Sequence, residues 1–114
     1  MKVALVAFNG ELMCFVHVLL NGLDMAQSGL DVKIVIEGSA TKLIPGLTKE
    51  GAPMFGLFAE AREKGLIDAV CRACSSKMGV LKEVEAEGLP LADEMSGHPS
   101  LARYLKEGYR IITF

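Results

Sequence analysis

Two short apolar stretches decide the fold: KVALVAF at residues 2–8 and VKIVI at residues 32–36. A continuous apolar run of this length is typical of a strand that is buried on both faces of a parallel sheet. Between the two runs, apolar residues recur at helical spacing from Leu12 to Leu23, with Asn9 as the predicted cap and Gly29 as the predicted stop. Strand, helix and strand in the first 36 residues predict a βαβ unit.

The rest of the chain continues this alternation. We expect a short helix near residues 41–47, a helix opened by Pro53 and ended by Gly65, and a third strand at residues 66–70. A helix is predicted over residues 77–86, a short strand or connector at 89–92, a helix after Pro99 and a last strand at 110–114. The pattern predicts one α/β domain over residues 1–114, with a mostly parallel sheet, helices on both faces and a flavodoxin-like strand order.

Composition narrows the classes of function. The chain has 114 residues, of which 51% are apolar, enough for one packed core. The formal net charge of -2 disfavours nucleic-acid binding, and no apolar run reaches the roughly 18 residues of a membrane helix. Three cysteines are too few, and odd in number, for a disulfide scaffold. We therefore expect free thiols in a cytoplasmic protein that has neither nucleic acid nor a membrane as its partner.

A functional site is expected at the carboxyl edge of the sheet, where open parallel sheets bind their ligands. The first three predicted strands end beside Asn9, Glu37 and Cys71. Cys74 follows Cys71 by three positions, and His98 precedes a helix that starts from this same edge. These five residues are therefore expected to converge on one rim.

The segment from Cys71 to Cys74, which reads CRAC, is the sharpest motif. The thiolate is the reactive form of cysteine, and the N–H groups of a following helix would favour it. Arg72 and Lys77 add positive charge nearby. A second cysteine three positions on is able to resolve a disulfide or persulfide on the first. The residues therefore point to thiol chemistry on Cys71, assisted by Cys74 and Arg72.

Each of these residues also has a plain structural interpretation. Cysteines are often buried and inert, which would make Cys71 a packing residue. His98 would then only cap the helix that Pro99 opens, and Glu37 would be a solvated charge at the end of a strand. Solvent exposure and neighbours of Cys71 decide between the two interpretations.

Metal and nucleotide sites are not predicted. Cys71, Cys74 and His98 supply three ligands, but no fourth is apparent and the paired C-x-x-C spacing of zinc sites is missing. Cys14 and His17 are neighbours on the first helix and supply only two ligands, so Cys14 is expected in the core or an interface. No glycine-rich phosphate fingerprint follows the first strand, and no G-x-S-x-G elbow occurs. We predict neither a bound metal nor a cofactor.

The first helix carries more apolar residues than one face against a sheet requires. They are Leu12, Met13, Phe15, Val16, Val18, Leu19, Leu20 and Leu23. The surplus predicts contact with a second subunit, and the alternative is burial beneath residues 38–52.

Residues 70–80, VCRACSSKMGV, resemble the cysteine loop of the DsrE/DsrF-like family. The resemblance extends to MKVALVAF at the start, to IEG at 36–38 and to GHPS at 97–100. It implies a flavodoxin-like domain that assembles into trimers or hexamers. In the sulfur-relay members it implies a persulfide on the residue that matches Cys71, which is passed to a partner protein. Cys74 stands where those members often carry alanine, and Met78 where they often carry a basic residue.

Three functions follow from these observations. The preferred one is a sulfur carrier or sulfurtransferase that holds a persulfide on Cys71, with sulfur donor and acceptor proteins or small persulfides as partners. The second is a non-enzymatic oligomeric module that binds a ligand or a partner. The third is a thiol–disulfide redox switch between Cys71 and Cys74.

Overall fold

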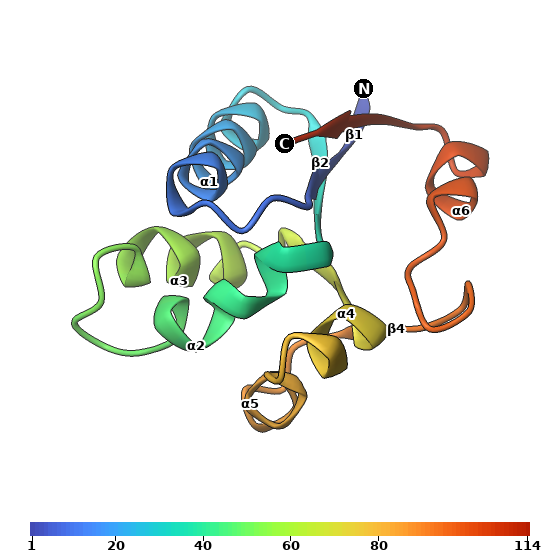
Figure 1. The fold of residues 1–114 in the computed structure, drawn as a ribbon. Helices are drawn as coiled ribbons and strands as arrows, with labels where there is room; N and C mark the ends of the chain where they lie inside the picture. Colours follow the sequence, from blue (N-terminus) through green and yellow to red (C-terminus); the bar gives the residue numbers. More distant parts are fainter.

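A five-stranded parallel sheet forms the centre of the molecule (Figure 1). Its strands are β1 (Lys2–Ala7), β2 (Asp31–Ile36), β3 (Ile67–Cys71), β4 (Leu91–Ala92) and β5 (Tyr109–Thr113), in the order β4-β3-β2-β1-β5. All four pairs of neighbouring strands are parallel. The structure is a computed structural model that describes all 114 residues.

The predicted class is confirmed, because the sheet is parallel and helices cover both of its faces, as in a flavodoxin-like α/β domain. The predicted strand order is wrong: a flavodoxin order is 2-1-3-4-5. Here β1 to β4 follow one another in one direction across the sheet, and only the last crossover returns to place β5 beside β1. Periodicity identifies strands but does not encode which strands become neighbours.

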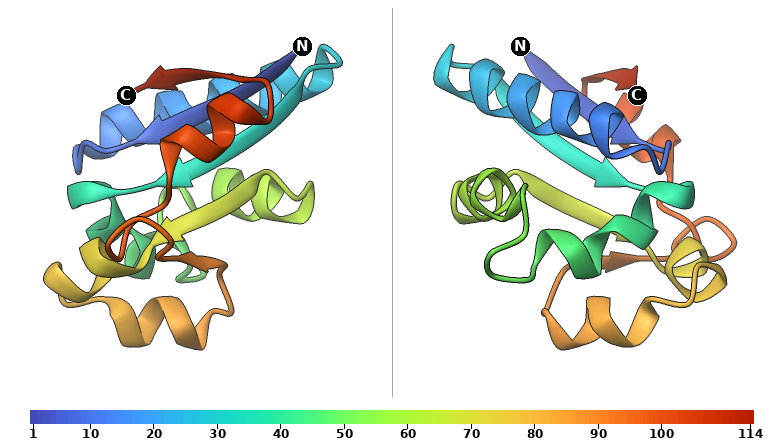
Figure 2. Two further views of the ribbon diagram at one scale, coloured as in Figure 1. Left: turned by 90° about the vertical axis from the view of Figure 1, so that its right-hand side faces the viewer. Right: turned by 60° about the vertical axis from the view of Figure 1, so that its left-hand side comes forward.

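Seven helical segments connect the strands. They are α1 (Leu12–Gln27), the 3-10 helix η1 (Gly38–Leu43), α2 (Ile44–Leu47), α3 (Phe55–Glu63), α4 (Arg72–Lys77), α5 (Leu81–Ala86) and α6 (Leu101–Lys106). Right-handed crossovers in one direction place α1, α3 and α5 on one face, and the reversed crossover places α6 alone on the other (Figures 1 and 2). None of the helices has the length and apolarity needed to cross a lipid bilayer.

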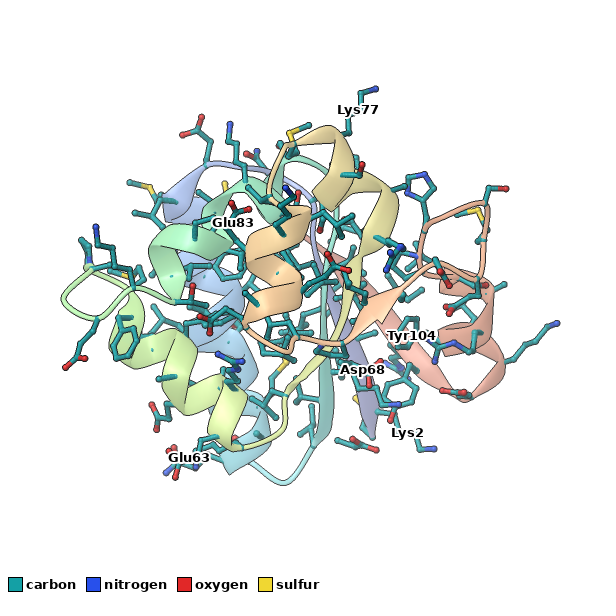
Figure 3. All side chains as sticks on the ribbon, turned by 90° about the horizontal axis from the view of Figure 1, so that it is seen from below. Lys2, Glu63, Asp68, Lys77, Glu83 and Tyr104 are labelled. Carbon is teal, nitrogen blue, oxygen red and sulfur yellow. The ribbon has the colours of Figure 1, made fainter.

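Two hydrophobic clusters reflect this unequal covering of the sheet. The larger contains 20 buried residues and joins α1, α3 and α5 to the sheet through side chains such as Phe15, Phe58 and Val84. The smaller contains six buried residues around Tyr104 of α6. Tyr104 also donates a hydrogen bond of 2.5 Å to Asp68, and Figure 3 shows the two side chains next to each other. On this second face of the sheet, one short helix, α6, therefore supplies the packing.

Several expected helix boundaries are corrected. The helix predicted over residues 77–86 begins only at Leu81, as α5, because Lys77 is the last residue of the separate helix α4 and the chain turns between them at Gly79 with a φ of 75°. Asn9 does not cap α1: the N-cap is Glu11, and the Asn9 side chain accepts a hydrogen bond of 2.8 Å from the Glu11 backbone N–H. The side-chain cap of α6 is Ser100.

A bulge in β3 decides which way its last residue faces. Ile34 of β2 pairs with Ile67, but the next residue of β2 pairs with Ala69, so Asp68 is an extra residue. Ile67 lies in the large cluster and Ala69 in the small one, beneath α6. Strict alternation would have placed Cys71 on the same face as Ile67. The extra residue turns Cys71 toward the face on which the chain preceding α6 lies.

Candidate functional site

The two cysteines of the CRAC motif lie where β3 passes into α4. Cys71 is the last residue of β3 and the N-cap of α4, and its sulfur accepts a hydrogen bond from the Cys74 backbone N–H at 3.3 Å. The Ser75 hydroxyl donates to the Cys71 carbonyl at 2.7 Å, which fixes the backbone of the turn. Because Cys74 follows Cys71 by three residues, it lies in the first turn of α4, where its backbone N–H contacts the Cys71 sulfur.

A tight turn brings His98 to the same place. Met95 and His98 exchange two backbone hydrogen bonds of 2.8 and 2.9 Å, and both residues between them have a positive φ, 51° at Ser96 and 92° at Gly97. The Ala73 backbone N–H donates to the Gly97 carbonyl at 2.9 Å, so the turn is docked onto α4. A Cβ on Gly97 would lie 3.0 Å from the Cβ of Ala73, so glycine permits this close approach.

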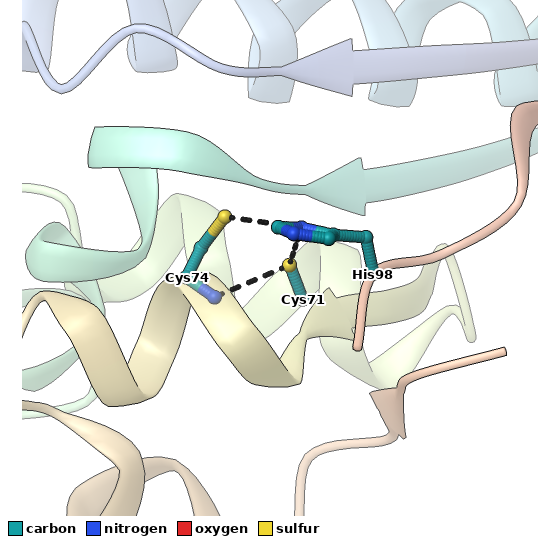
Figure 4. Close-up of side chains that lie close together, drawn as sticks. All are labelled: Cys71, Cys74 and His98. Carbon is teal, nitrogen blue, oxygen red and sulfur yellow. Dashed lines mark hydrogen bonds between the residues drawn. The ribbon is translucent and has the colours of Figure 1, made fainter. Parts of the chain in front are cut away.

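Cys71, Cys74 and His98 form one cluster (Figure 4). The Nδ1 atom of His98 lies 3.0 Å from the Cys71 sulfur and 3.6 Å from the Cys74 sulfur. Cys71 is fully buried, whereas Cys74 and His98 are half-buried. All three cysteines of the chain are free thiols. The burial of Cys71 fits its interpretation as a packing residue, whereas its contact with the His98 imidazole fits that of a reactive thiol.

The surroundings favour the neutral thiol of Cys71. Burial raises the pKa of Cys71 to about 12; the Cys74 amide hydrogen bond lowers this pKa, while the Cys74 thiol and, to a smaller extent, the negative charge of Glu37 raise it further. Glu37 is itself buried, which raises the pKa of its carboxyl, while the nearby His98 lowers it. The expectation that the start of the helix and nearby cations yield a stable thiolate is wrong for the resting protein.

The predicted rim is only partly assembled. Cys71, Cys74 and His98 meet, and Glu37 lies close enough to act on the charge of Cys71 and His98. The Arg72 guanidinium instead lies 3.9 Å from the Glu85 carboxylate. The side chain of Asn9 is exposed and holds the backbone before α1. Neither side chain forms a hydrogen bond with either sulfur.

Other predicted charges and thiols also lie apart from the cluster. Lys77 is exposed, and Figure 3 shows its side chain extending outward from the fold. Cys14 is half-buried on α1 and His17 is exposed, and neither belongs to the cluster. The sequence predicted that Arg72 and Lys77 would lie beside the Cys71 sulfur, but the side chain that contacts it is the imidazole of His98.

Two features that position the cluster were missed from the sequence. The turn at Ser96 and Gly97 has a signal, since Ser-Gly is a common turn dipeptide. The bulge at Asp68 has none, because it depends on the pairing of β3 with β2. Four surface hollows of 240 to 470 Å³ are lined by neither Cys71, Cys74 nor His98. None of these hollows therefore opens onto the cluster.

Similar proteins identify the family. An uncharacterized protein of Methanocaldococcus jannaschii is 33% identical over 118 residues, which cover 98% of this chain and 94% of that protein. An uncharacterized protein of Archaeoglobus fulgidus is 49% identical over 37 residues, which are 32% of this chain and 100% of that protein. The solved structure of a conserved protein of unknown function from Bacteroides thetaiotaomicron is similar to this one, with a TM-score of 0.74 and 18% sequence identity. The match covers 99% of this chain and 94% of that chain, and it supports the fold alone. The sequence profile of the DsrE/DsrF-like family matches residues 3–114, so this chain belongs to that family, which suggests a role related to sulfur relay.

Proposed function

We propose that this protein is a sulfur carrier that holds a persulfide on Cys71 and passes its outer sulfur to a partner thiol. The observation that carries the proposal is the distance of 3.0 Å between the Cys71 sulfur and Nδ1 of His98. An imidazole at this distance is able to take the proton of the buried thiol as the sulfur attacks. Membership of a family with a sulfur-relay-related role supports the same chemistry.

The loading step needs no external oxidant or reductant. As the Cys71 sulfur attacks the outer sulfur of a donor persulfide, R–S–SH, its proton moves to Nδ1 of His98. A bond forms between the two sulfurs, and the S–S bond of the donor breaks. The leaving thiolate then takes the proton from His98. The products are a Cys71 persulfide and R–SH, so atoms and charges balance.

The unloading step uses the other groups of the cluster. The Cys74 backbone N–H, 3.3 Å from the Cys71 sulfur, stabilises negative charge on it when it becomes the leaving group. An acceptor thiol gives its proton to Nδ1 of His98 and attacks the outer sulfur, so that the S–S bond of the Cys71 persulfide breaks and the acceptor becomes the persulfide. The Cys71 thiolate then takes the proton from His98 and returns to the thiol. Alternatively, Cys74 attacks the inner sulfur, which releases hydrosulfide and forms a Cys71–Cys74 disulfide that a partner dithiol must reduce.

The partners that fit this chemistry are sulfur donor and acceptor proteins or small persulfides. We further propose that the protein works as a homo-oligomer in a reducing compartment such as the cytoplasm. The surface that supports an oligomer lies at one end of β1 and α1, where Phe8, Leu12 and Met13 are 58%, 41% and 76% exposed.

Intact-mass spectrometry after treatment with polysulfide tests the carrier function. The wild-type protein and the Cys14→Ser control should both gain the mass of added sulfur, and the gain should vanish on reduction. Cys71→Ser should gain none. Equal labelling of Cys71→Ser would contradict the proposal, and slow, uniform alkylation of all three thiols would instead support a non-enzymatic binding module.

A redox switch is the second candidate, because the Cys71 and Cys74 sulfurs lie within 4.8 Å of each other. In glutathione buffers of increasing oxidation, Cys14→Ser would then lose two hydrogens of mass reversibly, and Cys74→Ser would not. A switch without any sulfur uptake from polysulfide would replace the carrier function.

A further inference from the structure

We propose that Cys71, Cys74 and His98 form a zinc site whose fourth coordination position is open. Their ligand atoms, two sulfurs and one imidazole nitrogen, all lie within 4.8 Å of one another. This donor set suits Zn²⁺, which favours thiolate and imidazole ligands in a tetrahedral arrangement. The inference does not depend on persulfide chemistry, and it reverses the expectation from spacing alone that the chain has no metal site.

The distances are close to those that a tetrahedral ion requires. Zinc–sulfur bonds of about 2.3 Å and zinc–nitrogen bonds of about 2.1 Å place a sulfur and a nitrogen ligand about 3.6 Å apart. The Cys74 sulfur is 3.6 Å from Nδ1 of His98, and the Cys71 sulfur is 3.0 Å from it. Of the two sulfur–nitrogen distances only the second must widen, by about half an ångström, and the two sulfurs, which lie within 4.8 Å of each other, must come to about 3.8 Å apart.

The backbone already supports the three ligands. The Cys74 N–H bond to the Cys71 sulfur, at 3.3 Å, is the type of contact that stabilises a metal-bound thiolate. His98 is held by the turn that Ala73 anchors through its 2.9 Å hydrogen bond to Gly97. Because Nδ1 faces both sulfurs, the ligands converge without a change of fold (Figure 4).

Charge also favours a cation here. Two thiolates and a neutral imidazole balance the charge of Zn²⁺, so the buried sulfur of Cys71 would carry no unpaired charge. Glu37 is the only buried carboxylate of the chain and lies close enough to act on Cys71 and His98. Each zinc ion that binds would displace the thiol protons.

Zinc and persulfide would compete for the same atom. The Cys71 sulfur cannot be a zinc ligand in this set and at the same time carry a persulfide in the resting geometry. Bound zinc would therefore protect the chain from polysulfide, while its open position would accept water, a thiolate or hydrosulfide.

Cobalt and zinc titrations of the reduced, chelator-treated full-length protein test the site. Co²⁺ should give thiolate-to-metal charge-transfer absorption and the intense visible bands of tetrahedral cobalt, saturating at one ion per chain and bleached by Zn²⁺. Cys71→Ser, Cys74→Ser and His98→Asn should each weaken binding by about tenfold or more. Cys14→Ser and His17→Asn, which remove the same residue types outside the cluster, should bind like wild type.

Absence of the charge-transfer band, or its persistence at full strength in Cys74→Ser and His98→Asn, would overturn the inference. Circular dichroism of the metal-free variants checks folding, and Cys74 and His98 are half-buried, so their variants serve even where Cys71→Ser unfolds. Polysulfide labelling of the metal-free protein separates the two proposals. Zinc binding without sulfur uptake contradicts only the carrier function, and uptake without zinc binding contradicts only this inference.

Discussion

Glu37 is the carboxylate whose charge, together with the Cys74 thiol, opposes a thiolate at Cys71. Glu37→Gln keeps the shape of the side chain and removes that charge, so the pKa of Cys71 should fall. A fall of a few tenths of a unit makes alkylation of Cys71 at mildly alkaline pH about two- to five-fold faster. Peptide mapping after timed iodoacetamide treatment measures this rate. Glu85→Gln, which removes the exposed partner of Arg72, should change little, and an unchanged or slower rate in Glu37→Gln would contradict the effect.

The buried thiol of Cys71 should also make stability depend on alkaline pH. Its pKa in the folded protein is raised from 9.0 to about 12, so folding holds the proton more tightly than the unfolded chain does. The contribution to stability is complete below the ordinary value and is lost as pH rises toward 12. Over that window, one such group accounts for a loss of at most about 1.4 kcal/mol per pH unit.

Urea unfolding of metal-free protein at a series of alkaline pH values checks this dependence. Wild type should lose stability more steeply with pH than Cys71→Ser, which lacks the titrating group. Tyr104 has a raised pKa for the same reason, burial, and remains in both proteins, so its effect cancels in the comparison. Identical slopes would show that Cys71 is not held as a neutral thiol.

At the scale of elements, the turn before α6 positions His98 through Gly97. Gly97→Ala places a residue with a side chain at a φ of 92° and its Cβ 3.0 Å from Ala73. It should lower stability by about 1 kcal/mol or more and separate His98 from the two sulfurs, which weakens both sulfur loading and metal binding. Gly88→Ala is the matched control, because Gly88 has a φ of 69° and nothing within 4 Å of an added Cβ.

Both alanine variants should lose similar stability in urea, but only Gly97→Ala should change cobalt absorption or polysulfide uptake. Equal cobalt spectra in the two variants would mean that the turn does not position the imidazole. Equal loss of the site in both would mean that general destabilisation, and not the contact with Ala73, is responsible.

The same elements show what a sequence is able to predict. Strands β1 and β2 are predictable from the sequence because strands that are buried on both faces of the sheet are continuously apolar. The position of the site at the carboxyl edge of the sheet is predictable from the ends of the strands, and this rule correctly brings Cys71, Cys74 and His98 together. The break at Gly79 does have a signal, because glycine is common just after the last turn of a helix, but the prediction depended on Leu81 and Val84, which both lie beyond the break.

Side-chain direction and burial are tertiary properties, and they explain the remaining errors. Arg72 was expected to support Cys71, but a charge on another element, Glu85, attracts it. The extra residue Asp68 redirects Cys71, and only the pairing with β2 reveals it. Spacing therefore predicted which residues meet, but not that their surroundings would raise the pKa of the thiol.

At the scale of the whole molecule, the exposed apolar surface of Phe8, Leu12 and Met13 is expected to bind a second copy of the chain. Met13→Glu places a charge in that surface and should lower the molar mass measured by light scattering after size-exclusion chromatography. Leu105→Glu is the control, because Leu105 is 60% exposed on α6, which covers the opposite face of the sheet (Figure 2). A monomeric wild type, or dissociation by Leu105→Glu alone, would contradict this surface as the interface.

Because Cys71, Cys74 and His98 meet within one chain, the dissociated Met13→Glu protein should still take up sulfur at the wild-type stoichiometry. A loss of uptake on dissociation would mean that the second copy completes the site.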